Sequence, residues 1–450
     1  MLVTSLLAGC PDRGISEVVP NQDKAEVKDI PLQLNRNLDL LFVIDNSGSM
    51  KEEQTGLAAN FPKFVQVLQQ VQGGLPDVHM GVVSSNMGAG NNGINNCTPP
   101  GDAGHLLQGP GGTHCSGLDP NAKFISDVSD GANGRTTNYT GDLGTLFSCM
   151  AQLGTDGCGL EAHLESMRTA LDPANAFNAG FIRKDAYLGI VIIGDEDDCS
   201  AKDPSVFSPS DTAKGPINFR CAEYGVTCDG DTDPLHMQVK GVRANCKPRE
   251  DSQYIFPVQR YIDFVKGLKS DPKSIVVADI GAPKEPWVIG DNTYEQKPTE
   301  PALQASCQSS TGFAVPTLRV QTFTGAFPDR NSFSTICNTD FSDALINIAQ
   351  LIKEVIGDPC IEGTLKDIDL NTPGVQPDCV VSQVTDPGTA METEKILPEC
   401  DGSHSNTPCW TFQTDAMQCA STPSMLKLVT DYGNNPAPLN THIKAQCVVQ

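Results

Sequence analysis

An apolar run that ends in three evenly spaced oxygen-bearing side chains is the feature that most constrains this fold. Residues 40–44 read Leu-Leu-Phe-Val-Ile, and Asp45, Ser47 and Ser49 follow at alternate positions. The run is too short for a membrane span and too uniformly apolar for a half-exposed strand, so it predicts a strand inside a parallel sheet. The loop after such a strand is where open α/β sheets bind their ligands. One carboxylate and two hydroxyls there suit a small divalent cation such as Mg²⁺.

A second acidic loop follows another predicted buried strand. Residues 187–193 are almost wholly apolar, and the string Gly-Asp-Glu-Asp-Asp begins at Gly194. Between the two loops, apolar residues at helical spacing over 57–71 predict a helix that Pro62 should kink or delay, and residues 78–85 predict another strand. For the first loop taken alone, a polar turn is the alternative, because Asn-Ser-Gly-Ser is good turn chemistry.

The string Asp45-x-Ser47-x-Ser49 after an apolar strand resembles the metal-ion-dependent adhesion site of von Willebrand factor type A (vWA) domains. The resemblance implies that these three residues hold Mg²⁺, or Mn²⁺ or Ca²⁺, and that Asp195 completes the site directly or through water. The family also supplies a threonine from a loop before an intervening helix. Thr155 is the available hydroxyl, but Cys158 stands where the family has its threonine, so either Thr155 or a water fills that position.

Strand and helix patterns continue to alternate along the chain. A helix is expected over 254–268, a strand over 275–280 and a closing amphipathic helix over 341–355. This order predicts an α/β fold over residues 37–358, with a doubly wound, mostly parallel sheet of vWA or Rossmann-like type. Two stretches rich in Gly, Pro, Asn and Cys, near 87–147 and 199–252, interrupt it. Their composition favours surface loops over a second core.

The chain contains 17 cysteines, which is rare for a cytosolic protein. No C-x-x-C pair and no paired histidine spacing occurs, so disulfides are favoured over zinc sites. Residues 359–450 are expected to form a small, cysteine-rich, disulfide-braced region, with a partly disordered tail as the alternative. The cysteine-bearing strings resemble secreted or lipid-anchored bacterial members of the family, especially the myxobacterial kind. Proximity and this resemblance imply the pairs Cys149–Cys158 and Cys307–Cys337.

The N-terminal string Leu-Leu-Ala-Gly-Cys, residues 6–10, resembles a bacterial lipobox. It implies a signal peptide over 1–10, a lipid on Cys10 and a spacer over 11–36. No Lys or Arg precedes the short apolar stretch, so either the natural chain starts upstream or the match is accidental. No other stretch approaches the roughly 18–20 apolar residues of a membrane helix. The expected location is therefore the cell envelope, lipid-anchored or secreted, with membrane contact only through the anchor.

Composition and missing motifs exclude several function classes. A formal net charge of -24 opposes nucleic-acid binding, which needs clustered Lys and Arg. No histidine lies near either acidic loop in sequence, and G-x-S-x-G, P-loop and H-E-x-x-H motifs are absent, so an enzyme is not expected. The resemblance implies a metal-dependent adhesion module that captures the Asp or Glu carboxylate of a protein partner. The alternatives are a structural envelope lipoprotein without ligand capture and, less favoured, a metal-dependent hydrolase.

Overall fold

The computed structural model describes residues 24–31, 36–71, 74–130, 134–231, 233–269, 271–293, 296–310, 312–357, 359–369, 371, 376–385, 391–403, 405–416, 419, 422–433 and 441–449. The chain divides into two compact units. The sheet unit is Leu34–Asp358, and the terminal unit combines Met1–Gln33 with Pro359–Gln450. Cys10 and the expected signal peptide over 1–10 lie outside the described residues.

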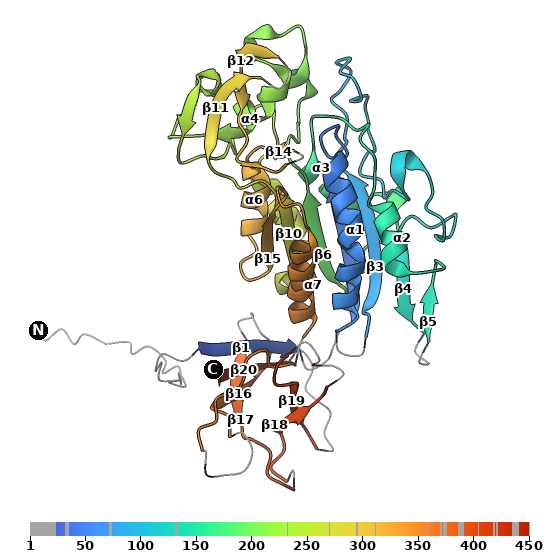
Figure 1. The fold of residues 1–450 in the computed structure, drawn as a ribbon, viewed down its shortest axis with the longest axis vertical. Coiled ribbons are helices and arrows are strands. Elements are labelled where there is room, and N and C mark those ends of the chain that lie inside the picture. The colour runs from blue at the N-terminus through green and yellow to red at the C-terminus, as the bar shows by residue number, and fades with distance from the viewer. Residues whose placement is uncertain are drawn as a thin grey trace, which may run out of the picture. The chain divides into compact units, whose positions relative to one another are not determined.

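The sheet unit is built on a seven-stranded sheet with the order β15-β10-β6-β2-β3-β4-β5 (Figure 1). Its strands are β2 (Asn37–Ile44), β3 (Asp77–Ser84), β4 (Ile125–Ser129), β5 (Arg135–Thr137), β6 (Tyr187–Ile193), β10 (Ile275–Gly281) and β15 (Asn331–Thr335). The strands from β15 to β3 pair in parallel, whereas β4 and β5 are antiparallel. The sheet is therefore mixed. Both antiparallel strands come from 87–147, the stretch expected to form surface loops, so that expectation was wrong.

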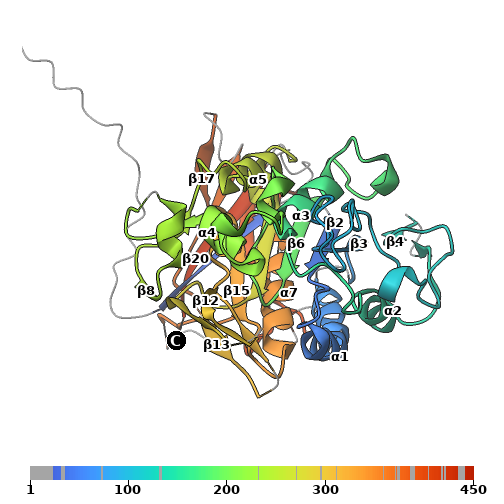
Figure 2. The same ribbon diagram turned by 90° about the horizontal axis from the view of Figure 1, so that it is seen from above.

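Helices cover both faces of this sheet, as Figure 2 shows for α1 and α7 on one side and α3 and α5 on the other. The helices are α1 (Lys51–Leu68), α2 (Leu143–Met150), α3 (His163–Leu171), α5 (Val258–Lys266), α6 (Leu318–Gly325) and α7 (Ser342–Gly357). The side chains of β2 alternate between the two cores. Leu40 and Phe42 belong to the core with α1, α2 and α7, whereas Leu41 and Val43 belong to the core with α3, α5 and α6. The central strand is thus buried on both faces, as its composition predicts.

Helix α1 begins at Lys51 and continues through Pro62, so this proline does not delay the start of the helix. Proline has no N–H, so the carbonyl of Ala58, four residues earlier, lacks its usual helical partner. The Ser148 hydroxyl of α2 donates to that carbonyl at 2.8 Å. Helix α2 also packs closely at this point, because a Cβ on Gly144 would lie 2.9 Å from the Pro62 Cα. A neighbouring helix therefore supplies the hydrogen bond that Pro62 cannot.

The second interrupting stretch, 199–252, does not consist only of surface loops. Together with later residues it forms α4 (Arg220–Gly225), β7 (Val226–Thr227), β8 (Gly241–Arg243), β9 (Lys247–Pro248), β11 (Trp287–Asn292), β12 (Lys297–Leu303), β13 (Cys307–Gln308) and β14 (Phe313–Ala314). Strand β11 pairs with both β8 and β12. Phe219, Val226 and Met237 pack with Trp287 and Ile289 in a small core of their own. The expectation that this stretch forms no second core was therefore wrong. The apolar residues of the small core come from segments far apart in sequence, so the local composition did not reveal it.

The terminal unit is an antiparallel structure that both ends of the chain build. Its sheet has the order β1-β20-β16-β17, and β18 pairs with β19. The strands are β1 (Lys24–Pro31), β16 (Cys379–Thr385), β17 (Thr393–Leu397), β18 (Cys409–Thr414), β19 (Leu426–Asp431) and β20 (Thr441–Val449). Strand β1 falls in the segment expected to be a spacer, 11–36, and pairs with β20 along its whole length. Part of that segment is therefore folded.

The sixteen cysteines of the described residues form eight disulfides. Cys307–Cys337 is as expected, but the expected Cys149–Cys158 pair is wrong. Cys158 pairs with Cys97, and Cys149 pairs with Cys115. So many disulfides are typical of a protein that folds outside the cytosol. Across the described ranges, no helix has the length and apolar character that crossing a membrane requires.

Candidate metal centre

Three adjacent strands end at one edge of the central sheet. Strands β6, β2 and β3 are parallel neighbours, so the residues that follow them lie close together. Asp45 follows β2, Ser85 follows β3, and Asp195 comes two residues after β6. The Asp45 N–H donates to the Ile193 carbonyl at 2.8 Å, which ties the first loop to the end of β6. The carboxyl edge of parallel strands is the usual ligand-binding edge of an open α/β sheet.

Four of the five residues expected to hold a metal form one connected group. The Ser47 N–H donates to Asp45 Oδ1 at 2.7 Å. The Ser47 and Ser49 hydroxyl oxygens lie 3.0 Å apart. The Ser49 hydroxyl then donates to Asp195 Oδ1 at 3.2 Å, although the two residues are 146 positions apart in sequence. The fold thus brings the two acidic loops together around two serine hydroxyls.

The fifth expected residue, Thr155, lies in a loop that packs against the first acidic loop. The Gln54 side chain connects the two, because its Nε2 donates both to the Asp45 carbonyl at 2.8 Å and to the Gly154 carbonyl at 2.9 Å. The Gly157 N–H donates to the Asn46 carbonyl at 2.8 Å. Among the described contacts, however, the Thr155 hydroxyl bonds to none of the other four residues. The structure therefore places its loop at the site without bringing the hydroxyl into contact.

The two aspartates of the site are buried and have no positively charged partner among the described residues. Asp45 is fully buried and Asp195 is 4% exposed. Burial raises the pKa of Asp45 to about 7, and burial together with the Asp45 charge raises the pKa of Asp195 well above its usual range. Asp45 Oδ2 has no hydrogen-bond partner, and no Lys or Arg of the described residues pairs with either carboxylate. Two buried carboxylates side by side are unfavourable unless a cation or protons neutralise them.

Two polar residues that the sequence analysis did not select also lie at the site. The Ser85 hydroxyl donates to Asp45 Oδ1 at 3.2 Å. Glu53 is buried on the first turn of α1, its Oε2 has no partner in the described structure, and its charge contributes to raising the pKa of Asp195. Ser85 had a sequence signal, because it directly follows its strand as Asp45 follows β2.

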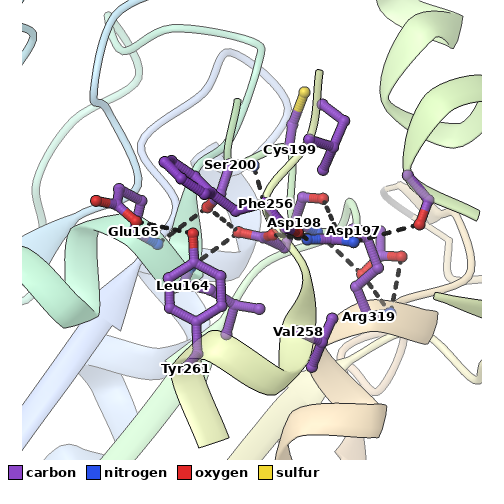
Figure 3. Close-up of polar contacts among 12 residues, drawn as sticks. Leu164, Glu165, Asp197, Asp198, Cys199, Ser200, Phe256, Val258, Tyr261 and Arg319 are labelled. Carbon is purple, nitrogen blue, oxygen red and sulfur yellow. Dashed lines mark hydrogen bonds and ion pairs between the residues drawn. The ribbon is translucent and has the colours of Figure 1, made fainter. Parts of the chain in front are cut away.

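The second half of the acidic loop has a structural role (Figure 3). Asp198 accepts from Arg319 Nη2 at 3.0 Å and from the Leu164 N–H at 2.9 Å, near the start of α3. Asp197 accepts from the N–H groups of Arg319 and Val320 at the start of α6. Asp198 is fully buried, so this part of the acidic run is not a solvent-exposed loop. Asp195 and Glu196 are the residues of the run without a partner of this kind.

His163 lies behind the site and does not supply a positive charge. It is fully buried at the start of α3, and neither ring nitrogen has a partner in the described structure. Burial lowers the pKa of His163 to about 4, so its ring is neutral at neutral pH. The neighbouring Gly194 has no room for a side chain, because a Cβ there would lie 2.5 Å from His163 Nε2.

The donor set fits a hard divalent cation. Mg²⁺ takes carboxylate and other oxygen ligands and keeps several waters when protein ligands are few. Asp45 offers an unpartnered carboxylate oxygen, and the Ser47 and Ser49 hydroxyls lie within hydrogen-bond distance of each other. Over the described residues, no group of three or more His, Cys, Asp and Glu side chains has a metal-holding arrangement. A site here therefore depends on the serine hydroxyls as well as on the carboxylates.

No protein-family model and no curated protein matches the chain. Among solved structures, it is similar to the pilus adhesin RrgA from Streptococcus pneumoniae, with 10% identity and a TM-score of 0.29 over 96% of this chain and 60% of that one. It is similar to the tip pilin GBS104 from Streptococcus agalactiae, with 11% identity and a TM-score of 0.30 over 94% of this chain and 81% of that one.

A third similar structure is the conserved hypothetical protein BatB from Bacteroides thetaiotaomicron. Here the identity is 9% and the TM-score 0.28, over 71% of this chain and 98% of that one. Two of the three are thus bacterial surface adhesins. At these TM-scores the likenesses do not establish a shared fold, so the function has to be argued from the site itself.

Proposed function

We propose that the sheet unit is a metal-dependent protein-binding module of vWA type. Asp45, Ser47 and Ser49 would hold one Mg²⁺ or Mn²⁺, and Asp195 would complete the site directly or through water. The observation that carries this proposal is the Asp45 carboxylate, which is fully buried, has one unpartnered oxygen and has no cation among the described residues. A bound divalent ion would offer an open coordination position to an incoming anion.

The charges at the site favour a carboxylate as that anion. The hydroxyls of Ser47 and Ser49 are neutral, so among the proposed ligands only Asp45 and Asp195 carry a negative charge. If Asp195 acts through water, the ion keeps positive charge in a partly buried site. An Asp or Glu side chain of a partner protein would neutralise it, whereas a neutral sugar would not.

The cellular setting we propose is the bacterial envelope. The eight disulfides of the described residues support a place outside the cytosol, and a lipid on Cys10 or secretion would put the module at the cell surface or in the periplasm. In this setting the module would act in adhesion or in assembly with another envelope protein.

A displayed library of random peptides tests the proposal and does not require the partner protein to be identified first. Peptides would be selected on the immobilised wild-type chain in Mg²⁺ and then eluted with EDTA. We expect the eluted pool to be enriched in Asp or Glu, to rebind with Mg²⁺ or Mn²⁺, and to be lost on the Asp45→Asn variant. Glu285→Gln, which changes an exposed carboxylate of the same unit, is the matched control and should bind like wild type.

Two outcomes would overturn the proposal. Peptides that bind equally well in chelator, or an EDTA-eluted pool without acidic residues, would contradict capture of a carboxylate at a metal. If the chain binds Mg²⁺ but selects no peptides, the structural envelope alternative replaces adhesion.

A further inference from the structure

A cavity of about 180 Å³ lies in the sheet unit beside the acidic loop that follows β6. Its walls are largely apolar and include Phe219, Trp287, Leu303 and Phe313. These residues belong to the small core and strands built by the stretch 199–252 and by β11 to β14. The stretch 199–252, which was expected to form surface loops, therefore contributes with β11 to β14 to the wall of a defined cavity.

Two carboxylates without a protein cation also line this cavity, namely Glu161 and Glu196. Glu161 is 2% exposed, and its Oε1 has no hydrogen-bond partner. The charge of Glu196 acts on Glu161, and no Lys, Arg or His is among the described residues that line the space. The other two carboxylates on its rim, Asp197 and Asp198, already bind Arg319 and the helix starts. Glu161 and Glu196 are thus the part of this acidic rim without a positively charged partner.

Trp287 adds a hydrogen-bond donor to the same wall. Its side chain is 1% exposed, and Nε1 has no partner in the described structure. A buried indole N–H normally has an acceptor, so a ligand that fills the cavity would be expected to supply one. Aromatic walls also attract cations through their ring faces.

We infer that this cavity binds the side chain of an Arg or Lys residue of a partner protein. The cationic head would pair with Glu161 and Glu196, the apolar stem would pack on Phe219 and Leu303, and a peptide carbonyl of the ligand would accept from Trp287 Nε1. A second metal ion fits less well, because a Ca²⁺ ion takes six to eight oxygens, whereas most of this wall is carbon. This site adjoins the proposed metal centre, because Glu196 follows Asp195 directly and the charge of Asp45 acts on Glu161.

Tryptophan fluorescence offers a direct readout, since the chain has two tryptophans and Trp410 lies in the terminal unit. In a Trp410→Phe background, Trp287 reports on the cavity alone. The probe is N-acetylarginine methylamide, and its neutral isostere N-acetylcitrulline methylamide is the matched control ligand. In chelator we expect saturable binding of the arginine probe, and binding of the citrulline probe weaker by about tenfold or more.

Substitutions of the two glutamates test whether they bind the arginine probe. Glu161→Gln and Glu196→Gln should each weaken the arginine probe by about tenfold or more. The exposed-site control Glu285→Gln should leave its binding unchanged.

Three results would overturn the inference. Equal binding of the citrulline probe would show an apolar pocket without charge selection. Saturable Ca²⁺ or Mg²⁺ binding that competes with the arginine probe and is lost in Glu161→Gln would assign the two carboxylates to a metal. No binding of the arginine probe to the folded chain would remove the site altogether. If Glu161→Gln fails to fold, Glu196→Gln and the pair of probes still decide the question.

Discussion

Two buried aspartates lie near the ends of β2, Asp39 within the strand and Asp45 directly after it, and their charge environments differ. Asp39 is fully buried, yet Arg183 Nε lies 2.7 Å from its Oδ1 and Lys269 Nζ 3.9 Å from its Oδ2. Asp45, also fully buried, has no such partner among the described residues, and its Oδ2 is unpaired. Burial raises the pKa of both aspartates, but only at Asp39 do protein cations oppose that rise. The fold supplies a cation where the carboxylate is structural and omits one at the proposed binding edge.

The same contrast recurs within four consecutive residues. Asp197 and Asp198 bind Arg319 and the starts of two helices, whereas Asp195 and Glu196 face the candidate sites without a cation. Acidic residues alone therefore do not mark a binding site in this protein. The binding candidates Asp45 and Glu161 are buried, have no protein counter-charge and have one carboxylate oxygen without a partner in the described structure.

Substitution of Asp39, the aspartate with protein cations beside it, should have the largest effect on stability. Asp39→Ala leaves the Arg183 and Lys269 charges without their carboxylate, which should lower the free energy of unfolding of the sheet unit by about 3–5 kcal/mol. Urea denaturation in the Trp410→Phe background, followed by Trp287 fluorescence, measures it. The loss should be equal in EDTA and in Mg²⁺. A loss that Mg²⁺ reverses would show that Asp39 also belongs to the metal centre, and the contrast would fail.

At Asp45, which has no protein cation beside it, the contribution to stability should instead depend on pH. Because burial raises the pKa of folded Asp45 to about 7, the folded state binds a proton that the unfolded chain releases above about pH 4. In chelator, the stability contributed by protonated Asp45 is fully present below pH 4 and is lost as pH rises through 7. Each unit of pKa shift corresponds to about 1.4 kcal/mol.

Urea denaturation of wild type and Asp45→Asn in EDTA, from pH 4 to pH 8, measures this linkage. Other buried carboxylates titrate as well, so the relevant quantity is the difference between the two proteins. The wild type should lose more stability than Asp45→Asn as pH rises, and saturating Mg²⁺ should reduce that difference. Parallel pH curves for the two proteins in chelator would contradict the proposed charge state of Asp45.

Removal of a hydroxyl should have a smaller effect on the metal than removal of a carboxylate. Ser47→Ala and Ser49→Ala each delete a neutral ligand, so Mg²⁺ affinity should fall by about tenfold, less than in Asp45→Asn. Calorimetric titration of the three variants under identical conditions ranks them. If either serine variant binds Mg²⁺ as wild type does, that hydroxyl is not a ligand.

The smallest effect is expected at Ser85. Its hydroxyl donates to Asp45 Oδ1 at 3.2 Å, so Ser85→Ala should cost one hydrogen bond, about 0.5–1.5 kcal/mol of stability, and change Mg²⁺ affinity little. A loss of affinity as large as that of Ser47→Ala would make Ser85 a ligand and enlarge the proposed donor set. Urea denaturation and calorimetry on the same preparation separate the two roles.

The central strands and the two acidic loops were predictable because their signals are local. An unbroken apolar run followed by Asp45 identifies β2, and the run over 187–193 identifies β6 with the same bounds as in the structure. The order of elements then places Asp45 and Asp195 at one edge of the sheet. The contact between Ser49 and Asp195 follows from that order.

The remaining features depend on partners that are distant in sequence. Arg319 gives no local sign that it binds Asp198, which lies 121 residues away. The cavity wall at Trp287 is formed only when β11 pairs with β8, from the stretch that composition assigned to loops. Disulfide partners are equally non-local, since Cys97 and Cys158 are 61 residues apart. Polar, turn-rich composition predicted exposure, whereas in both interrupting stretches tertiary pairing produced strands and small cores.

Calorimetric titration of Mn²⁺ and Mg²⁺ into chelator-treated protein tests the central claim most directly. The account predicts one divalent ion per wild-type chain, the same for the Glu285→Gln control, and none for Asp45→Asn with its fold intact by circular dichroism. Unchanged affinity and stoichiometry in folded Asp45→Asn, or no binding by the folded wild type, would contradict it.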